Sequence, residues 1–242
     1  MHTNPDITTD LFLGGKLKIH QFKKGFRSGS DAVFLSAFIP SISGKILEIG
    51  CGAGVASLCL GYRAPEAHIT GIDSEESLIH LAQENAQING LTDRCTFVAQ
   101  DVRHLTLPRQ TFDHVFSNPP YFNASSPSPC PQKALARTQS IPLADWVGYC
   151  IKMAKPRGRV SFIFPTEDLH HLLLTLKGLG DIHLVPLWPA PHQPSKRILV
   201  SARKGVKSGL HLGAGLVLHT HQGGAYTPEA EGILRDGKNL SY

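Results

Sequence analysis

The sequence of 242 residues predicts an α/β fold in which a mostly parallel sheet of seven strands carries helices on both faces. Short apolar segments alternate along the chain with longer segments whose apolar residues recur with a helical period. A glycine-rich turn joins the first strand of this series to a helix. The chain is also long enough for one large domain, and elements that alternate in this way are typical of parallel strands joined by crossover helices.

The predicted elements follow one another in a regular series. A Gly-Gly turn beside alternating residues predicts a hairpin within residues 10–21, and residues 25–40 are expected to turn helical. The predicted strands are 45–49, 69–73, 95–99, 112–117, 159–164, 181–186 and 197–203. The predicted helices are 55–63, 75–89, 143–155 and 167–178. Residues 216–218 could add a strand, and no chemistry is assigned to the glycine-rich tail 205–242.

Composition restricts the compartment and the chemistry. No apolar run approaches the length of a transmembrane helix, and residues 1–6 lack the basic and apolar regions of a signal peptide. The five cysteines form no Cys-x-x-Cys pair, which argues against zinc sites and a disulfide framework. We therefore expect a reducing, cytoplasmic location. No metal site is expected, since His219 and His221 would share a strand face but lack an apparent third ligand.

Positive charge is concentrated in one part of the chain. The net charge is +5, yet residues 121–210 contain 12 Lys and Arg against four acids and so carry +8. The rest of the chain carries −3. This division favours a polyanionic partner, although folding could also disperse these side chains as ordinary solvated charges.

A ligand site is predicted at the ends of the first three strands of the series. The turn after strand 45–49 follows Glu48 and is rich in glycine, which allows a sharp turn and a close approach to a ligand. Its glycines are Gly50, Gly52 and Gly54. Asp73 ends the second strand, where a carboxylate can accept both hydroxyls of a ribose, and Asp101 follows the third. A nucleotide-dependent dehydrogenase is one interpretation of these features.

The tetrapeptide Asn118-Pro119-Pro120-Tyr121 follows the fourth strand and predicts a site for a planar amine. The two prolines fix φ and remove two N–H donors, so the loop is stiff. The Asn118 side-chain oxygen and the Pro119 carbonyl can each accept one hydrogen of an –NH2 group. The ring of Tyr121 can stack on the plane that carries the amine. A Pro-Pro turn that merely ends a strand is the simpler alternative.

Together these motifs resemble class I methyltransferases that act on amino groups and use S-adenosylmethionine. The resemblance implies the Rossmann-like fold of that class and S-adenosylmethionine as the cofactor. It places Asp73 at the ribose and Asp101 at the adenine amine of the cofactor, and implies that Asn118, Pro119 and Tyr121 are catalytic. The other cofactor contacts implied for the loops are Glu48, Gly50, Gly52, Gly54 and Asn118 itself. A dehydrogenase would leave the Asn-Pro-Pro-Tyr loop unexplained.

Residues 21–35 closely resemble the opening of the bacterial tRNA1(Val) (adenine-37-N6)-methyltransferase family, which also has Ala-Arg after its Asn-Pro-Pro loop, as in Ala136-Arg137. The resemblance covers about residues 10–205. It implies that residues 1–30 form a hairpin and cover the cofactor site, that 31–205 form the methyltransferase domain, and that 206–242 extend the same domain. It also places Arg27 and Asp31 near the cofactor.

Each of these two residues has a physical interpretation of its own. Arg27 could pair with the methionine carboxylate in a bidentate fork. The alternative for Asp31 is that it caps a helix over 32–39. The substrate contacts implied beyond the strand are Tyr121, Phe122, Lys133 and Arg137.

The expected partner is therefore tRNA, with no membrane and with a monomer or weak dimer as the assembly. The alternatives left open are N-methylation of another exocyclic amine in rRNA or DNA, or of a protein glutamine at N5. The glutamine enzymes need no basic region and carry an N-terminal helical domain that is missing here. An RNA-binding protein with an inactive site is the alternative outside enzymes. The Pro/Ser-rich insert 124–131 departs from the family and leaves the RNA species open.

Overall fold

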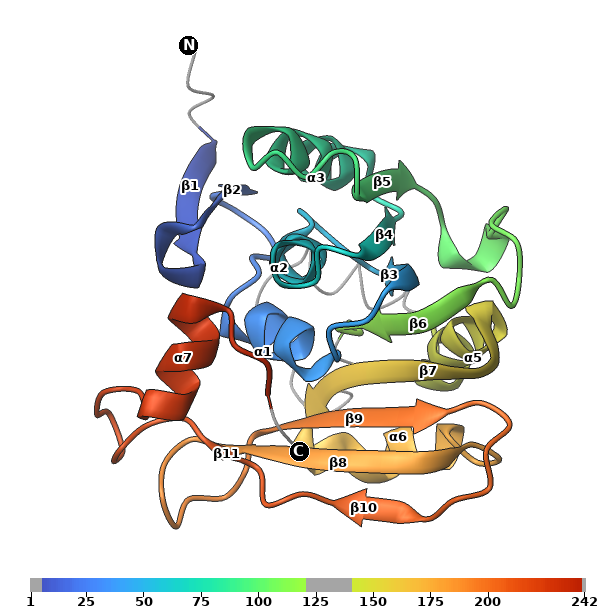
Figure 1. Ribbon diagram of the computed structural model, residues 1–242, viewed down its shortest axis with the longest axis vertical. Helices are drawn as coiled ribbons and strands as arrows, with labels where there is room; N and C mark the ends of the chain where they lie inside the picture. Colours follow the sequence, from blue (N-terminus) through green and yellow to red (C-terminus); the bar gives the residue numbers. More distant parts are fainter. Residues whose placement is uncertain (1–5, 121–140, 241–242) are drawn as a thin grey trace.

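The computed structural model describes residues 6–120 and 141–240, and its centre is a nine-stranded sheet (Figure 1). The strands are β3 (Gly44–Ile49), β4 (Ala67–Asp73), β5 (Cys95–Ala99), β6 (Phe112–Ser117), β7 (Ala154–Pro165), β8 (Gly180–Trp188), β9 (Arg197–Arg203), β10 (Leu210–Leu212) and β11 (Leu216–Val217). Their order is β10-β8-β9-β7-β6-β3-β4-β5, and β11 also pairs with β8. All pairs are parallel except those of β9, which runs antiparallel to β7 and β8.

All seven predicted strands are present, and the sheet is larger than predicted because the C-terminal segment adds β10 and β11. Both lie along β8, whose backbone groups on that side would otherwise remain unpaired. The predicted α/β class with a mostly parallel sheet is confirmed.

Helices cover both faces of the sheet (Figure 1). They are α1 (Ser30–Phe38), α2 (Val55–Arg63), α3 (Glu76–Ile88), α5 (Leu143–Met153), α6 (Leu169–Thr175) and α7 (Pro228–Asp236), with short 3-10 turns η1 (Leu13–Gly15), η2 (Val102–His104) and η3 (Thr166–Asp168). Successive side chains of a strand point to opposite faces, so Ile46 packs with α1, α2, α3 and α7 while Leu47 packs with α5 and α6. The core therefore has two layers, one on each side of β3.

The predicted N-terminal hairpin consists of β1 (Ile7–Phe12) and β2 (Leu17–Phe22), paired antiparallel. Asn85 of α3 and Asn89, the residue at which this helix ends, hold it in place. Asn85 accepts a hydrogen bond from the backbone N–H of His20 (2.7 Å) and donates one to its carbonyl (3.0 Å). Asn89 accepts a hydrogen bond from the backbone N–H of Lys18 (2.9 Å) and donates one to the carbonyl of Lys18 (2.7 Å). The two side chains thus take the place of a neighbouring strand beside β2.

Helix α7 was not predicted from the sequence. Thr227 caps its start, since its hydroxyl accepts the N–H of Ala230 at 3.2 Å, and Pro228 follows in the first turn. Gly237 ends the helix with a φ of 71°, a conformation that favours glycine. The residues after it return to α1, where Leu240 donates its N–H to the carbonyl of Ala37 at 3.0 Å. The C-terminal segment therefore belongs to the same folded unit as the sheet.

Two expectations from composition can be compared with the structure. Across residues 6–120 and 141–240, none of the helices has both the length and the apolar character needed to cross a membrane. The four cysteines in this part of the chain are free and buried.

Candidate active site

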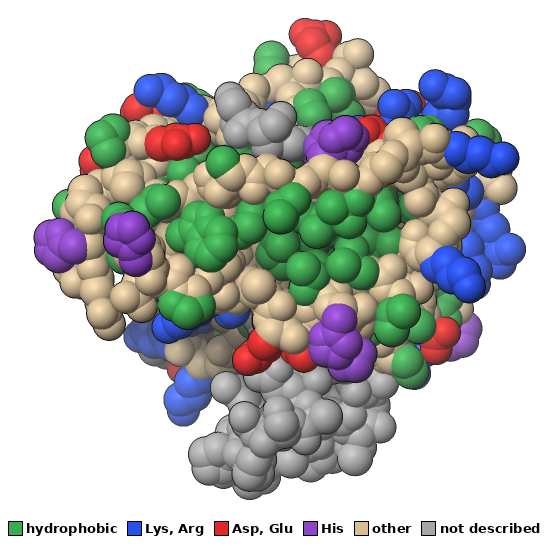
Figure 2. All heavy atoms as spheres, turned by 90° about the horizontal axis from the view of Figure 1, so that it is seen from below, with side chains coloured by type: hydrophobic (Ala, Val, Ile, Leu, Met, Phe, Trp, Pro, Cys, Tyr) green, Lys and Arg blue, Asp and Glu red, His purple; other side chains and the backbone are tan. Residues whose placement is uncertain are grey.

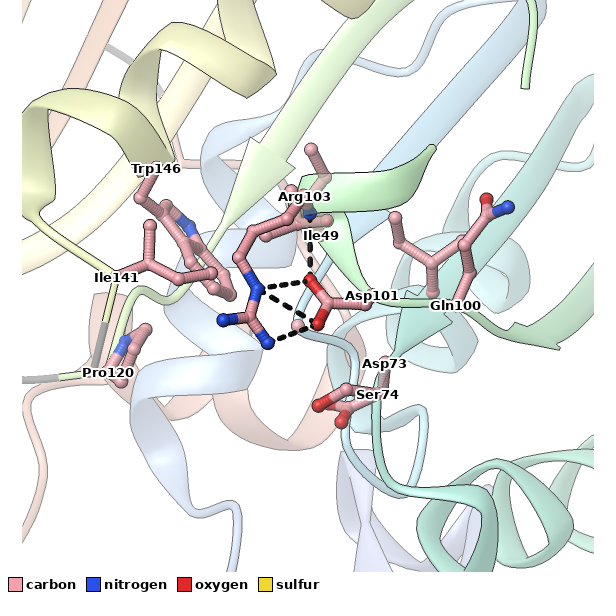
Figure 3. A pocket seen from close by; sticks show the side chains of 12 residues that line it. Ile49, Asp73, Ser74, Gln100, Asp101, Arg103, Pro120, Ile141 and Trp146 are labelled. Carbon is pink, nitrogen blue, oxygen red and sulfur yellow. Dashed lines mark hydrogen bonds and ion pairs between the residues drawn. The ribbon is translucent and has the colours of Figure 1, made fainter. Parts of the chain in front are cut away.

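A pocket lies at the edge of the sheet where β3, β4, β5 and β6 end (Figure 3). These strands are parallel, so their carboxyl ends meet at one edge, and ligands of open α/β sheets bind there. The side chains labelled around the pocket are Ile49, Asp73, Ser74, Gln100, Asp101, Arg103, Pro120, Ile141 and Trp146. Trp146 lies at the start of α5, and Ile141 lies just before this helix. The other seven residues lie at or just after the ends of the predicted strands.

The glycine turn after β3 forms the floor of the pocket. Its three predicted glycines all have positive φ, 76° at Gly50, 52° at Gly52 and 82° at Gly54. At Gly50 space is also limiting, because a Cβ would lie 3.0 Å from the ring of Trp146. The backbone therefore requires glycine at this point, both for its conformation and for the approach of α5.

Trp146 is anchored to the strands beneath it. Its indole N–H donates to the hydroxyl of Ser117 at 2.9 Å, and this hydroxyl donates to the carbonyl of Ile49 at 2.7 Å. The relay joins the first turns of α5, the end of β6 and the end of β3. The wall and the floor of the pocket are thereby fixed relative to each other.

Asp73 lies where predicted, at the end of β4 in the pocket. One carboxylate oxygen accepts the N–H of Gly52 at 2.9 Å, and the other accepts the N–H of Glu75 at 3.1 Å. Each oxygen keeps further acceptor capacity, because a carboxylate can accept about four hydrogen bonds. Two hydroxyl groups of a ligand can therefore bind the same carboxylate.

Glu48, which we expected to contact the cofactor, is buried against α2. It is 3% exposed, does not line the pocket, and accepts both the N–H (3.0 Å) and the hydroxyl (2.5 Å) of Ser57 in the first turn of α2. Burial raises the pKa of Glu48 to about 8, so its carboxyl is mostly protonated at neutral pH. The contact that the structure shows for Glu48 is a structural one, which holds α2 against the end of β3.

Asp101 follows β5 in the pocket and is paired with Arg103 (Figure 3). The guanidinium Nε lies 3.0 Å from both carboxylate oxygens and Nη2 lies 2.5 Å from Oδ2. The carboxylate also accepts the backbone N–H of Arg103 at 2.8 Å. The hydrogen bonds from Arg103 lower the pKa of Asp101 to about 2, so it stays ionised. Arg103 was not anticipated from the sequence.

The loop after β6 contains a buried acceptor without a partner. The side-chain oxygen of Asn118 is buried and accepts no hydrogen bond within the described parts of the chain, and the same holds for the oxygen of Gln100. A buried acceptor left unpaired is costly, so the oxygen of Asn118 indicates a ligand that supplies a donor. The amide of Gln100 is bonded to Thr106 and points away from the pocket (Figure 3). Pro119 is buried and Pro120 reaches the pocket. Tyr121, Phe122, Lys133, Arg137 and the insert 124–131 lie outside the described residues.

Arg27 and Asp31 have protein partners. Arg27 contacts the hairpin, with Nη2 2.6 Å from Asp10 and Nη1 2.8 Å from the hydroxyl of Thr8. Asp31 lies in the first turn of α1, whose N-cap is Gly29, so it does not cap this helix. Its carboxylate is 2.9 Å from Nε of Arg197 in β9. Neither residue lines the pocket, and their contact with a cofactor stays a prediction.

Part of the basic segment is paired with acids among the described residues. Lys155 pairs with Asp113 at 2.7 Å, and Arg159 pairs with Asp181. Asp181 also lies with His183 and His211 in a group whose possible metal-ligand atoms are within 4.8 Å of one another. This group was not considered from the sequence, and the charge of its carboxylate is already balanced by Arg159.

Comparison with known proteins links the chain to one family. A family model described as a methyltransferase domain matches residues 41–167. A tRNA1(Val) (adenine(37)-N6)-methyltransferase of Porphyromonas gingivalis is 31% identical over 205 residues, which cover 80% of each chain. The protein of the same name from Vibrio campbellii is 31% identical and covers 82% of this chain and 84% of its own. The one from Trichodesmium erythraeum is 28% identical and covers 90% and 93%.

Solved structures confirm the fold. A predicted O-methyltransferase from Agrobacterium tumefaciens superposes with a TM-score of 0.73 over 87% of this chain and 98% of its own, at 22% identity. M. jannaschii TYW2 in complex with AdoMet superposes with a TM-score of 0.59 over 84% and 88%, at 15% identity. At these identities the likeness concerns the fold alone.

Proposed function

Because this chain belongs to the tRNA1(Val) (adenine(37)-N6)-methyltransferase family, we propose that it transfers a methyl group from S-adenosylmethionine to the N6 amine of an adenine in tRNA. The names of the relatives point to adenine 37 of a valine tRNA as the target. The observation that carries the proposal is the buried, unpaired side-chain oxygen of Asn118, at the strand end beside the pocket. We place the target amine at this acceptor.

The residues around the pocket fit S-adenosylmethionine. This molecule presents hydroxyl and amino donors, and the pocket presents the carboxylates of Asp73 and Asp101, the second of which is bonded to Arg103. Asp73 would hold the ribose hydroxyls and Asp101 the adenine amine. The bound cofactor supplies a methyl group on a positively charged sulfonium, which is electrophilic without help from a metal or a covalent intermediate.

The task left to the protein is to prepare a weak nucleophile. The lone pair of an adenine amine is delocalised into the ring, so the nitrogen is planar and poorly reactive. Asn118 and the Pro119 carbonyl would each accept one N–H hydrogen, which favours a tetrahedral nitrogen and directs its lone pair toward the methyl group. Positioning of this kind is worth roughly 7 kcal/mol or more, and it requires a stiff loop. The prolines at 119 and 120 supply this stiffness.

No side chain has to act as a base before the transfer. The methylated nitrogen carries the surplus proton, which can leave to water afterwards. The target base in an anticodon loop is unpaired, so its capture costs little unstacking. Stacking by Tyr121 and phosphate contacts of Lys133 and Arg137 complete the proposal.

The test is methyl transfer from labelled S-adenosylmethionine to unmodified tRNA, followed by mass spectrometry of the nucleosides. The wild type should form N6-methyladenosine, while Asn118→Ala should lose activity by at least about a hundredfold and still bind the cofactor. Asn89→Ala, an asparagine substitution at the hairpin, serves as the matched control and should remain active.

The same assay distinguishes the alternatives. Label in rRNA or DNA but not in tRNA would mean that the enzyme methylates another exocyclic amine in one of those nucleic acids. Label in protein fractions alone would favour glutamine as the target. An Asn118→Ala enzyme as active as the wild type would contradict the role of the loop.

A further inference from the structure

Helix α5 connects the pocket with the opposite edge of the sheet. Its first turns carry Trp146 into the pocket. At its other end, the carbonyl of Lys152 accepts the N–H of Gln110 at 3.1 Å and that of Met153 accepts the N–H of Thr111 at 3.1 Å. Gln110 and Thr111 immediately precede β6, so α5 ends where β6 begins. With 11 residues, the helix covers about 16 Å between the two edges.

The outer face of α5 continues from the pocket with an aromatic ring and a cation. Tyr149 and Lys152 lie three residues apart and so share this face, with the Lys152 ammonium 5.1 Å from the centre of the Tyr149 ring. Toward the pocket, α5 packs beside η2, which carries Arg103. Arg103 uses Nε and Nη2 for Asp101, and its Nη1 points away from that carboxylate (Figure 3).

Two further cations lie where α5 ends. Arg109 is exposed and adjoins Gln110, which is bonded to Lys152. Arg157 is exposed at the start of β7, where its N–H donates to the carbonyl of Lys204 at 2.9 Å. Figure 2 shows Lys and Arg side chains along one side of the molecule, the side on which β6 and β7 begin in Figure 1. Cations thus extend from the pocket to the far edge.

Three exposed cations of this surface, Arg109, Lys152 and Arg157, have no anionic partner among the described residues, unlike Arg103 and unlike Lys155 beside them. Lys155 is paired with Asp113, and the ammonium of Lys204 donates to the carbonyls of Ile151 and Ala154. Within residues 6–120 and 141–240, the side chains of Arg109, Arg157 and Lys152 make no ion pair or hydrogen bond, and the Lys152 ammonium lies over the Tyr149 ring.

The backbone of Arg157 adds a second observation. Its φ is 64°, in the left-handed region that favours glycine. No described residue forms an ion pair or a side-chain hydrogen bond with this guanidinium, which leaves it available to a partner.

We propose that Arg103, Arg109, Tyr149, Lys152 and Arg157 form a track that binds the sugar–phosphate backbone of the substrate tRNA. The inference rests on the proposed function and extends it to the path of the RNA: a tRNA whose base enters the pocket runs along α5 to the opposite edge of the sheet. Cations spaced along a groove or face bind successive phosphates, and an aromatic ring among them can stack on a base. Asp145, one turn before Tyr149 on the same face, is the acid that opposes binding here.

The test compares tRNA binding by the wild type and by the double variant Lys152→Ala/Arg157→Ala. The probe is a full-length unmodified tRNA transcript, and the dissociation constant is measured by fluorescence anisotropy over a series of salt concentrations. Loss of two phosphate contacts should weaken binding about tenfold and reduce the slope of log affinity against log salt by about 1.5. Asp145→Asn should have the opposite effect and tighten binding about two- to threefold.

Two controls separate this effect from misfolding and from unspecific charge effects. Lys18→Ala removes an exposed lysine of the hairpin, on the far side of the sheet from α5, and should bind tRNA as the wild type does. The double variant should keep the affinity of the wild type for S-adenosylmethionine, measured by calorimetry.

The track is refuted if the wild type methylates tRNA and the double variant binds tRNA with the same affinity and the same salt dependence as the wild type. It is also refuted if Lys18→Ala weakens binding as much as the double variant. A wild type that neither binds nor methylates tRNA would overturn the proposed function itself, and the track with it.

Discussion

The side-chain amide of Asn85 donates a hydrogen bond to the carbonyl of Ala53, 3.0 Å away in the glycine turn. Asn85 is completely buried, and the remaining hydrogen bonds of its side chain go to the backbone of His20 in the hairpin. One residue of α3 therefore joins the N-terminal hairpin to the floor of the pocket.

Replacing Asn85 by Ala should affect both stability and cofactor binding. Buried backbone groups of His20 and Ala53 would lose their partner, which costs about 1–3 kcal/mol of unfolding free energy. The loosened turn should also weaken binding of S-adenosylmethionine. Thermal unfolding and calorimetric titration measure the two effects. Asn89→Ala is the matched control, because it removes equivalent bonds to Lys18 but does not reach the turn. Equal loss of cofactor affinity in both variants would contradict the role given to Asn85.

Glu48 should make the protein less stable as the pH rises. Its pKa is about 8 in the folded protein, against an ordinary value of 4.5. Between these values the unfolded chain releases the proton while the folded protein retains it, so folding becomes less favourable by up to about 1.4 kcal/mol per pH unit. Glu48→Gln keeps an acceptor for Ser57 and cannot ionise. Urea unfolding across this range should show a smaller decline for the variant, and identical pH profiles would disprove the shift.

Arg103 should be the cause of the low pKa of Asp101. The pKa is about 2 with the guanidinium in place, and Arg103→Ala should return it toward 3.8. Titration of the carboxyl carbon by NMR measures this directly. Asp113, whose pKa is lowered by Lys155, provides the internal reference and should titrate identically in both proteins. An unchanged Asp101 in the variant would mean that other groups hold the carboxylate ionised.

Trp146 should report binding at the pocket through its fluorescence. The chain has two tryptophans, and Trp146 lines the pocket while Trp188 lies at the end of β8. We expect S-adenosylmethionine to change the emission of the wild type and of Trp188→Phe, and to leave that of Trp146→Phe unchanged. A signal retained in Trp146→Phe would show that the cofactor binds elsewhere or acts at a distance.

The strands could be predicted because a buried parallel strand is a short apolar run between turn residues. The bounds of β5, β6 and β9 agree with the prediction to the residue. Helix α7 was missed although Thr227, Pro228 and Gly237 are ordinary end signals, because its apolar residues are few and surrounded by glycines.

The site was predictable where a residue's role depends on its position at a strand end. Asp73 and Asp101 reach the pocket because parallel strands bring their ends together. The partners of Glu48 and Asp31 were not predictable in this way, because they depend on which side chain arrives from elsewhere in the chain, Ser57 and Arg197. Trp146 was missed because α5 was identified only as a helix.

The relay from the Trp146 indole through Ser117 to the carbonyl of Ile49 has a thermodynamic consequence. It connects the helix along which we place the RNA with the turn at which we place the cofactor, so neither can shift without the other. Two ligands that each favour one arrangement of such a unit bind cooperatively, and the coupling is reciprocal. We therefore expect tRNA to raise the affinity for S-adenosylmethionine by the same factor by which S-adenosylmethionine raises the affinity for tRNA.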